Sequence, residues 1–365
     1  MNIKWAILRK DFFVFLGFYL LFFLAMKTAV FSTKPYDKTY LEAENKTQNP
    51  EGSHELVFYD VRLNDQTCRL AEGFPAICIF VNDRLGKKEL ECLAHRGIKL
   101  IALRCAGFNN VDLQAAKQLG IAVARVPAYS PASISEFTVG LMLTLSRKIH
   151  RAVNRTREGN FALDGLLGFD LHDKTVGVYG TGKIGAGAAK ILLGFGCRVL
   201  ATDMYENEDL KKQGVRYVSK DELFKESDIL TFHCPLTPET RHLIDPETIQ
   251  TMKQGVMIVN TSRGELLETE AAIAGLKSGR IGSLAIDVYE EEAGVFFEDN
   301  SSRVIQDDVL ARLLTFPNVI VTGHQAYFTA EAMRAIARQT LDNITAFERG
   351  EKPAGLIDWD MVRPK

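Results

Sequence analysis

From residue 28 onward, short apolar runs alternate with longer stretches of helical patterning. The short runs, rich in Val, Ile, Leu and Ala, predict strands, and the longer stretches predict helices. Gly97 and Gly120 follow two of the helical stretches, where glycine commonly ends a helix. The first series of predicted elements has strands at Thr28–Ser32, Glu55–Tyr59, Ala76–Val81, Leu100–Arg104 and Ala122–Val126, and helices at Lys88–Arg96 and Val111–Leu119.

A second series follows one long predicted helix, from Ser133 to about Glu158, whose second half is basic and typical of a solvated or subunit-contacting face. Strands separated by helices predict a parallel sheet with helices on both faces. The 365 residues, at roughly 150 per domain, predict two such α/β domains. The second series has strands at Val176–Tyr179, Arg198–Asp203, Ile229–His233, Val256–Thr261, Leu284–Val288 and Val319–Thr322, and helices at Ile184–Phe195, Lys220–Lys225, Pro246–Met252 and Glu268–Ser278.

An apolar run from Phe12 to Met26 precedes the first series and follows Lys4, Arg9 and Lys10. A basic flank before an apolar run resembles a signal peptide. The run has about 15 residues, which is short for a membrane span of about 20. The first predicted strand begins at Thr28, so no linker would separate a membrane helix from the sheet. We therefore expect residues 1–25 to be an extension from an upstream start site, with a signal or anchor as the alternative.

Charge and cysteine content narrow the choice of partners and compartment. The 44 Lys and Arg residues nearly balance 46 Asp and Glu, which disfavours nucleic acid as a partner because no basic excess meets the phosphates. The six cysteines show no Cys-x-x-Cys spacing. They predict reduced, buried thiols in a cytoplasmic protein, with neither a disulfide framework nor a bound metal.

Gly180, Gly182 and Gly185 form a Gly-x-Gly-x-x-Gly motif between a predicted strand and a predicted helix. The next strand ends in Asp203, close to the ~20-residue spacing of the dinucleotide fingerprint. The glycines permit a tight turn, approach of the backbone to a pyrophosphate and close packing of helix on strand. The acid favours NAD over NADP, because its charge repels a 2′-phosphate. The motif lies in mid-chain, so another domain precedes the nucleotide domain.

Reactive side chains follow several strands of the second series, and open α/β sheets bind ligands at these strand ends. Candidates are His233, Arg263, Asp287 with the acids of residues 290–292, and His324. A histidine suits proton transfer, a carboxylate can orient it, and an arginine can hold a substrate carboxylate. His233 and His324 remain equal candidates for the proton donor on this reasoning, and the other histidines are read as structural or surface groups.

Seven motifs give the chain a resemblance to the D-2-hydroxyacid dehydrogenase family, most closely to its bacterial NAD-dependent lactate branch. The similarity covers Met26 to about Gly350. The motifs are Leu103–Asp112, Val126–Pro131, Gly180–Gly185, His233–Pro238, Asn260–Gly264, Asp287–Glu292 and Gly323–Ala326.

The resemblance implies roles for particular residues. It selects Arg263 as the clamp for the substrate carboxylate, Glu292 as the partner of the histidine, and His324 as the general acid and base. It places Ala106, Gly107, Tyr129, Arg263 and Tyr327 at the substrate. Implied cofactor contacts are Gly180, Gly182, Lys183, Ile184, Gly185, Asp203, Cys234, Pro235, Thr261, Ser262, Arg263 and Asp287.

The resemblance also implies a fold and a reaction. A Rossmann NAD-binding domain (128–327) would be inserted into a flavodoxin-like substrate domain (26–127 with 328–352), with a cleft that closes on the substrate and a tail at 353–365. The expected reaction is reversible reduction of pyruvate to D-lactate with NADH, as in fermentation, by a cytoplasmic homo-oligomer, a dimer or tetramer, without a membrane partner. The alternatives are another small 2-oxoacid (glyoxylate, hydroxypyruvate or a branched 2-oxoacid) or a non-catalytic NAD-sensing protein.

Overall fold

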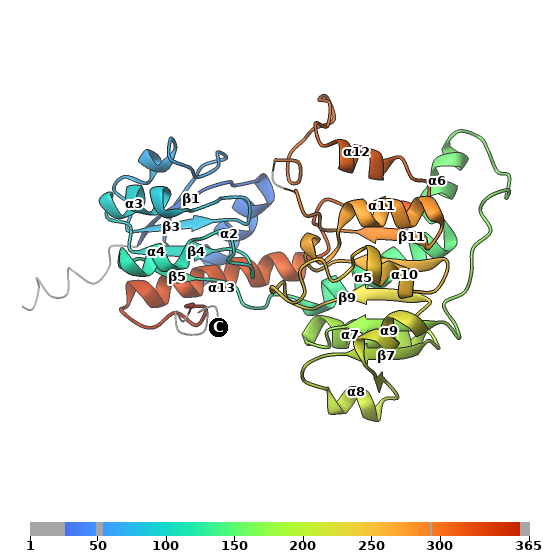
Figure 1. Ribbon diagram of the computed structural model, residues 1–365. Helices are drawn as coiled ribbons and strands as arrows, with labels where there is room; N and C mark the ends of the chain where they lie inside the picture. Colours follow the sequence, from blue (N-terminus) through green and yellow to red (C-terminus); the bar gives the residue numbers. More distant parts are fainter. Residues whose placement is uncertain (1–25, 49–53, 293, 358–365) are drawn as a thin grey trace, which may run out of the picture. The chain divides into compact units, whose positions relative to one another are not determined.

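The structure is a computed structural model that describes residues 26–48, 54–292 and 294–357 (Figure 1). The N-terminal extension expected at residues 1–25 and most of the expected tail lie outside these residues. The chain divides into two compact units. Of the described residues, the first unit holds those up to Tyr129 and from Ala330 onward, and the second holds those within Ser130–Thr329. The sequence placed these two boundaries after residues 127 and 327.

The first unit contains a parallel five-stranded sheet in the order β2-β1-β3-β4-β5. This is the flavodoxin-like order of a doubly wound sheet. The strands contain mainly buried aliphatic residues because helices cover parallel sheets on both faces. Their bounds are Lys27–Val30 (β1), Glu55–Phe58 (β2), Ala76–Ile79 (β3), Leu100–Leu103 (β4) and Ala122–Ala124 (β5).

Two helices from opposite ends of the unit's sequence share one hydrophobic core with this sheet. Leu41 of α2 and Leu341 and Ile344 of α13 pack in one cluster with Val30 and Cys78 of the strands. The C-terminal segment is thereby built into the first unit. The helices of the unit are α2 (Pro35–Gln48), the 3-10 helix η1 (Cys68–Ala71), α3 (Lys87–His95), α4 (Leu113–Gln118) and α13 (Ala330–Glu348).

The second unit contains a parallel seven-stranded sheet in the order β12-β11-β10-β9-β6-β7-β8. The chain runs outward from β6 through β7 to β8, and then returns to β9 on the other side of β6. This reversal is the switch point at which open α/β sheets bind ligands. The bounds are Thr175–Tyr179 (β6), Arg198–Thr202 (β7), Arg216–Tyr217 (β8), Ile229–Phe232 (β9), Val256–Asn260 (β10), Ile281–Ile286 (β11) and Val319–Val321 (β12).

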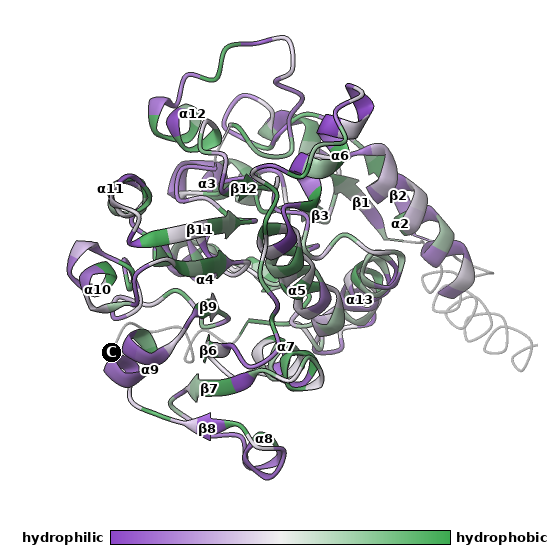
Figure 2. Cartoon of the chain, turned by 90° about the vertical axis from the view of Figure 1, so that its right-hand side faces the viewer, coloured by the Kyte–Doolittle hydropathy of each residue, from purple (hydrophilic) through white to green (hydrophobic). Residues whose placement is uncertain are grey.

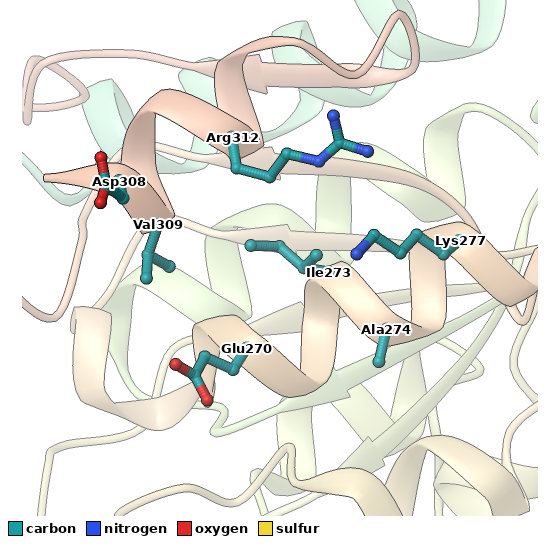
Figure 3. A pocket seen from close by; sticks show the side chains of 7 residues that line it. All are labelled: Glu270, Ile273, Ala274, Lys277, Asp308, Val309 and Arg312. Atoms are coloured by element: carbon teal, nitrogen blue, oxygen red, sulfur yellow. The ribbon is translucent and has the colours of Figure 1, made fainter.

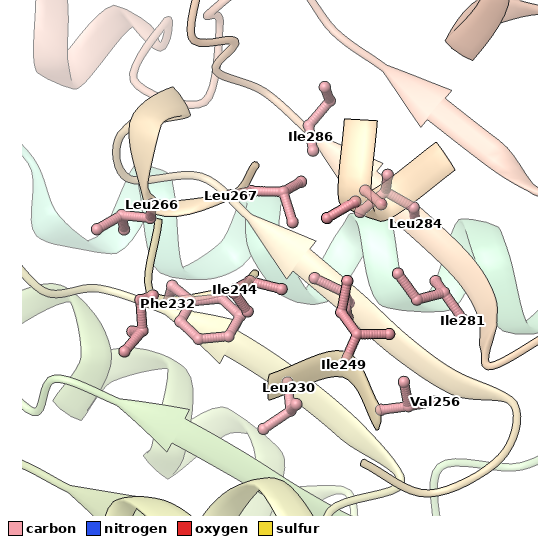
Figure 4. Close-up of a cluster of buried hydrophobic side chains, with 14 of the residues drawn as sticks. Leu230, Phe232, Ile244, Ile249, Val256, Leu266, Leu267, Ile281, Leu284 and Ile286 are labelled. Atoms are coloured by element: carbon pink, nitrogen blue, oxygen red, sulfur yellow. The ribbon is translucent and has the colours of Figure 1, made fainter. Parts of the chain in front are cut away.

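Alternate residues of these strands pack in two separate hydrophobic cores, one on each face of the sheet. Leu230 and Ile258 pack with residues of α9, α10, α11 and α12. Figure 4 shows part of this cluster, including Leu230 and Ile249. Ile229 and Val259 pack on the other face, with residues of α5, α7 and α8. Figure 2 shows α9, α10 and α11 on one side of the strands and α5 and α7 on the other. The helices are α5 (Pro131–Arg147), α6 (Ile149–Arg157), α7 (Lys183–Gly194), α8 (Glu208–Lys212), α9 (Lys220–Glu226), α10 (Pro246–Thr251), the 3-10 helix η2 (Gly264–Leu266), α11 (Thr269–Ser278) and α12 (Asp308–Leu314).

The single helix expected over Ser133–Glu158 is instead two helices. Lys148 separates α5 from α6 and has a left-handed backbone, with φ of 51°. Such a residue ends the first helix because its conformation cannot continue the hydrogen-bond ladder. Helices α2, α8 and α12 and strand β8 were not predicted.

Cys68 and Cys92 form a disulfide, with their Cα atoms 6.5 Å apart. The expectation of six reduced thiols is therefore wrong for this pair. The cause is tertiary: the fold places η1 against α3, and 24 residues separate the two cysteines. The remaining cysteines, Cys78, Cys105, Cys197 and Cys234, are buried and form no disulfide.

Among the described residues, no helix combines the length and the apolar character that crossing a membrane requires. No group of three or more His, Cys, Asp or Glu side chains in that part of the chain is placed to hold a metal ion.

Candidate active site

The Gly180–Gly185 turn joins β6 to α7 at the switch point. Gly180 has φ of +92°, and a Cβ there would lie 2.8 Å from the backbone nitrogen of Cys234. A Cβ on Gly185 would collide with the carbonyl oxygen of Gly180. Gly182 precedes α7 and has open space where its Cβ would be. The turn therefore presents bare backbone and a helix N-terminus, which suits the phosphates of a dinucleotide.

Asp203 follows β7 and lies beside this turn. Its Oδ2 accepts hydrogen bonds from the backbone N–H and the hydroxyl of Thr181, and its Oδ1 accepts one from the N–H of Tyr205. Tyr217 also donates to the Thr181 hydroxyl, at 2.8 Å. The acid is thus held at the end of the second strand of the nucleotide fold, where a carboxylate binds ribose hydroxyls.

Three neighbouring strands end at the same level. Asn260 of β10 is in register with Ile286 of β11, and Ile286 is in register with Val321 of β12. Adjacent strands lie about 4.8 Å apart. Arg263 and His324 lie three residues beyond the ends of β10 and β12, and Glu292 lies six residues beyond the end of β11, so all three follow strand ends at one edge of the second unit.

His324 and Glu292 form a close pair. Nδ1 of the imidazole lies 3.3 and 3.2 Å from the two carboxylate oxygens. An ionised carboxylate only accepts hydrogen bonds, so Nδ1–H donates and Nε2 is the nitrogen available for a substrate. Phe297 and Tyr327 flank the imidazole, with ring centroids 5.6 and 6.4 Å from it.

Asp287 holds the loop that carries His324. Its buried carboxylate accepts hydrogen bonds from Thr322 Oγ1 (2.6 Å) and from the N–H groups of Gln325 (2.9 Å) and Ala326 (2.8 Å). Burial raises the pKa of this carboxyl, and these hydrogen bonds oppose the rise. The N–H of His324 donates to the Asp287 carbonyl at 2.8 Å. In this structure the carboxylate therefore orders the loop; its predicted contact with the cofactor stays a prediction.

Arg263 lies on a loop that is held by hydrogen bonds of Asn260 and by close packing of Gly264. Asn260 accepts a bond from the N–H of Ser262 (3.1 Å) and donates its amide to the Arg263 carbonyl (2.8 Å). Gly264 presses on the backbone of residues 289–290, where no Cβ would fit. The residue after Arg263 therefore lies against the backbone of the segment that leads to Glu292. One guanidinium nitrogen donates to the Ser262 carbonyl at 2.7 Å.

The two candidate histidines differ sharply in surroundings. Nε2 of His233 lies 3.0 Å from the Thr231 hydroxyl, and its buried Nδ1 has no hydrogen-bond partner. Burial lowers the pKa of His233 to about 4. This imidazole is therefore neutral near pH 7 and makes a poor proton donor, whereas His324 has a carboxylate at hand.

The three glutamates at residues 290–292 also differ in their contacts. Glu290 pairs with Nε2 of His242 at 3.2 Å and accepts the N–H of Thr269 at 3.1 Å. Glu291 is exposed, and Glu292 faces His324. The structure thus gives only Glu292, among these three, a contact with His324.

The other predicted cofactor residues gather around the same turn. Ser262 donates to the Cys234 carbonyl at 2.8 Å, Thr261 shares a hydrogen bond with Thr138 at 2.8 Å, and burial raises the pKa of the Cys234 thiol to about 11. Lys183 and Ile184 open α7, and the Pro235 carbonyl accepts a bond from Thr240.

The predicted substrate residues Ala106, Gly107 and Tyr129 belong to the first unit. Arg125 donates to the Ala106 carbonyl at 2.8 Å, and the Cys105 thiol donates to the Gly107 carbonyl at 3.3 Å. These bonds order the turn after β4. The contact of this turn with a substrate stays a prediction.

Sequence reasoning missed Thr181, which bonds Asp203, and Phe297, which lies on His324. The paired phenylalanines after the acidic run were the available signal for the second. A separate pocket of about 360 Å³ lies between α11 and α12 (Figure 3) and contains none of the predicted site residues. Its lining residues are Glu270, Ile273, Ala274, Lys277, Asp308, Val309 and Arg312.

A dinucleotide-binding sheet whose strand ends carry an arginine, a carboxylate and an imidazole defines a nicotinamide-dependent oxidoreductase for carboxylate-bearing substrates. Residues 139–326 match the model of the D-isomer specific 2-hydroxyacid dehydrogenase, NAD binding domain. The chain is 53% identical over 326 residues to D-lactate dehydrogenase of Escherichia coli (strain K12), covering 89% of this chain and 98% of that relative.

Solved structures agree with this match. The apo-structure of D-lactate dehydrogenase from Escherichia coli gives a TM-score of 0.83 at 50% identity, covering 91% of this chain and 100% of that one. D-lactate dehydrogenase from Aquifex aeolicus, complexed with NAD and lactic acid, gives 0.80 at 32% identity, covering 93% and 100%. The chain belongs to the D-isomer specific 2-hydroxyacid dehydrogenase family, an NAD-binding family of oxidoreductases, which confirms the resemblance and the expected fold class.

Proposed function

We propose that this protein reduces pyruvate to D-lactate with NADH, reversibly, and that Arg263, Glu292 and His324 carry the reaction. The observation that carries the proposal is the pair formed by His324 Nδ1 and Glu292, 3.2 Å apart, on the same sheet edge as Arg263. Relatives named D-lactate dehydrogenase, one of them solved with NAD and lactic acid, support the choice of substrate.

The residues at the switch point fit NAD. The backbone of the Gly180–Gly185 turn and the start of α7 would hold the pyrophosphate, and Asp203 would hold the adenosine ribose. Cys234 and Pro235 would line the same site. When bound, the reduced cofactor supplies a hydride to the carbonyl carbon of the substrate.

Each of the three side chains has a distinct task in the proposed reaction. The Arg263 guanidinium binds the substrate carboxylate in a bidentate manner and polarises the carbonyl. His324 donates a proton from Nε2 to the oxygen as it gains negative charge. Glu292 accepts the hydrogen bond from Nδ1, fixes the tautomer and stabilises the imidazolium before transfer. In lactate oxidation His324 takes the proton back.

A coupled assay tests the proton donor. We expect the wild-type protein to oxidise NADH when pyruvate is added, and His324→Gln to lower kcat/KM by about 10²–10⁴-fold. The matched control is His172→Gln, since the His172 side chain is 71% exposed. Full activity in His324→Gln would refute the assignment.

A second assay tests the substrate clamp. Arg263→Gln removes the charge, so we expect a higher KM for pyruvate together with a lower kcat. Arg263→Lys keeps the charge but not the two-pronged geometry, and should fall between Gln and wild type. An unchanged KM in Arg263→Gln would contradict a carboxylate clamp.

A substrate panel separates pyruvate from the alternative 2-oxoacids. The proposal requires a higher kcat/KM for pyruvate than for glyoxylate, hydroxypyruvate or a branched 2-oxoacid, and a product of the D configuration in a stereospecific lactate assay. Tight NADH binding without turnover on any of these acids would favour the NAD-sensing alternative.

We further propose a homo-oligomer, formed through the region of α5 and α6 and the segment between α6 and β6, residues 158–174. The segment between α6 and β6 exposes large apolar side chains: Leu163 is 81% exposed and Leu167 is 88% exposed. Large exposed apolar side chains close together in the chain favour an interface. Light scattering should report a dimer or tetramer that Leu163→Asp with Leu167→Asp converts to monomer; an unchanged mass would place the interface elsewhere.

We also propose a cytoplasmic, fermentative role, because the reaction consumes NADH and returns NAD⁺. The four buried cysteines that form no disulfide are consistent with a reducing compartment, whereas the Cys68–Cys92 disulfide weighs against it. Cell fractionation followed by detection of the protein in the cytoplasmic or membrane fraction tests the location.

A further inference from the structure

The imidazole of His324 is contacted by more than its carboxylate partner. The ring of Phe297 lies over it, with centroids 5.6 Å apart and planes inclined at 39°. Tyr327 meets it edge-on, at 6.4 Å and 83°. Glu292 bonds Nδ1 at 3.2 Å. One carboxylate fixes a single ring nitrogen, so the contacts with the two aromatic rings bear on the orientation of the imidazole plane.

Phe297 occupies an unusual backbone conformation, with φ of +65°. A bulky residue rarely adopts the left-handed region, and such a conformation persists only where the surroundings enforce it. His324 itself has φ of +54°. Both members of the ring pair are therefore held in strained conformations, and strain of this kind gathers at functional sites.

The neighbouring Phe296 shows how the strain arises. Its buried side chain packs in the core of the second unit, with its ring 6.4 Å from that of Tyr289. The N–H groups of Val295 and Phe296 both donate to the Glu292 carbonyl, at 3.1 Å. One short segment thus carries Glu292, anchors itself through Phe296, and uses a left-handed turn to bring Phe297 onto His324.

We propose that Phe297 is a positioning residue for the proton transfer, and that its ring holds the imidazole plane so that Nε2 is aimed at the substrate oxygen. This rests on the proposed function, in which His324 donates the proton. Misplacement of a reacting group by about 1 Å can slow a reaction about 100-fold. Loss of the ring should therefore slow proton transfer without weakening the binding of pyruvate or NADH.

The test compares Phe297→Leu with Phe296→Leu, two identical changes at adjacent residues. For Phe297→Leu we expect kcat to fall at least tenfold, with both KM values within about twofold of wild type. The solvent deuterium isotope effect on kcat/KM should rise, because proton transfer becomes slower. For Phe296→Leu we expect a lower Tm and an unchanged isotope effect.

Two further variants separate the ring from the strain. Phe297→Tyr keeps the ring and should retain most of the wild-type kcat. Phe297→Asn suits the left-handed region and relieves the strain, so it should fold with a Tm at or above that of wild type and still show the low kcat. It also serves in place of Phe297→Leu if that variant fails to fold.

The outcomes are distinguishable. Wild-type kcat and isotope effect in Phe297→Leu or Phe297→Asn, or a change confined to KM, would overturn the positioning role. If Phe296→Leu shows the same loss of kcat and the same isotope effect, the effect of Phe297 is one of core packing, and the positioning role is overturned. Failure of the wild-type protein to oxidise NADH with pyruvate would instead overturn the proposed function.

Discussion

The Cys68–Cys92 disulfide gives a stability prediction that the structure quantifies. The bond closes a loop between residues 24 positions apart and so restricts the unfolded chain. The loop-closure relation gives about 3.5 kcal/mol of stabilisation for a loop of this length. Reduction, or Cys92→Ser, should lower the free energy of unfolding by about this amount, because both leave the same loop open.

Urea unfolding with and without dithiothreitol measures this difference, and Cys68→Ser with Cys92→Ser is the control that reductant should leave unchanged. Thiol titration under denaturing conditions provides a direct count. Four thiols should react before reduction and six after it, in keeping with the four cysteines outside the disulfide. Six reactive thiols without reductant, or identical unfolding curves in the two conditions, would show that the bond does not form.

Three other predictions concern single residues. Gly185→Ala should weaken NADH binding at least tenfold by fluorescence titration, because the new methyl collides with the Gly180 carbonyl and displaces the phosphate-binding turn. Lys148→Gly should raise the unfolding free energy by about 1 kcal/mol, measured by urea titration, because glycine adopts φ of 51° without strain. The pKa of His233 falls from 6.5 to about 4 on folding, so the unfolded chain binds the proton more tightly and stability drops as pH falls below 6.5. Between pH 7 and pH 5 this amounts to about 2 kcal/mol, which His233→Gln should lack, and equal losses in both proteins would contradict it.

The strands of the second unit were predicted well because their apolar runs are continuous and bounded by polar residues. Helix α2 was missed because Pro35–Gln48 is largely polar, and its buried face contains only Asp37, Leu41 and Asn45. The break at Lys148 carries no mark in the local sequence. It depends on the packing of α5, which the sequence does not display.

The candidate site was predicted where a motif fixes a residue's distance from a strand end. Arg263 and His324 fall in this group because the strand positions were correct. Residues that reach the site through tertiary contacts were not predictable, since no spacing relates Phe297 to His324 or Cys68 to Cys92. The reasoning from residues alone also left His233 and His324 equal, because the contact of His324 with Glu292 and the desolvation of the His233 imidazole separate them, and both depend on the fold.

Asn260, Ile286 and Val321 are in register at the ends of three neighbouring strands. This register determines where insertions and deletions in the chain can be tolerated. Deleting one residue within β10, β11 or β12 would draw that strand's reactive group back by about 3.3 Å and turn its side chains to the opposite face. Insertions between Asn300 and Asp307, beyond Phe297, would leave all three strand ends where they are. Length variation among functional relatives should therefore be found in that segment and be absent from the three strands.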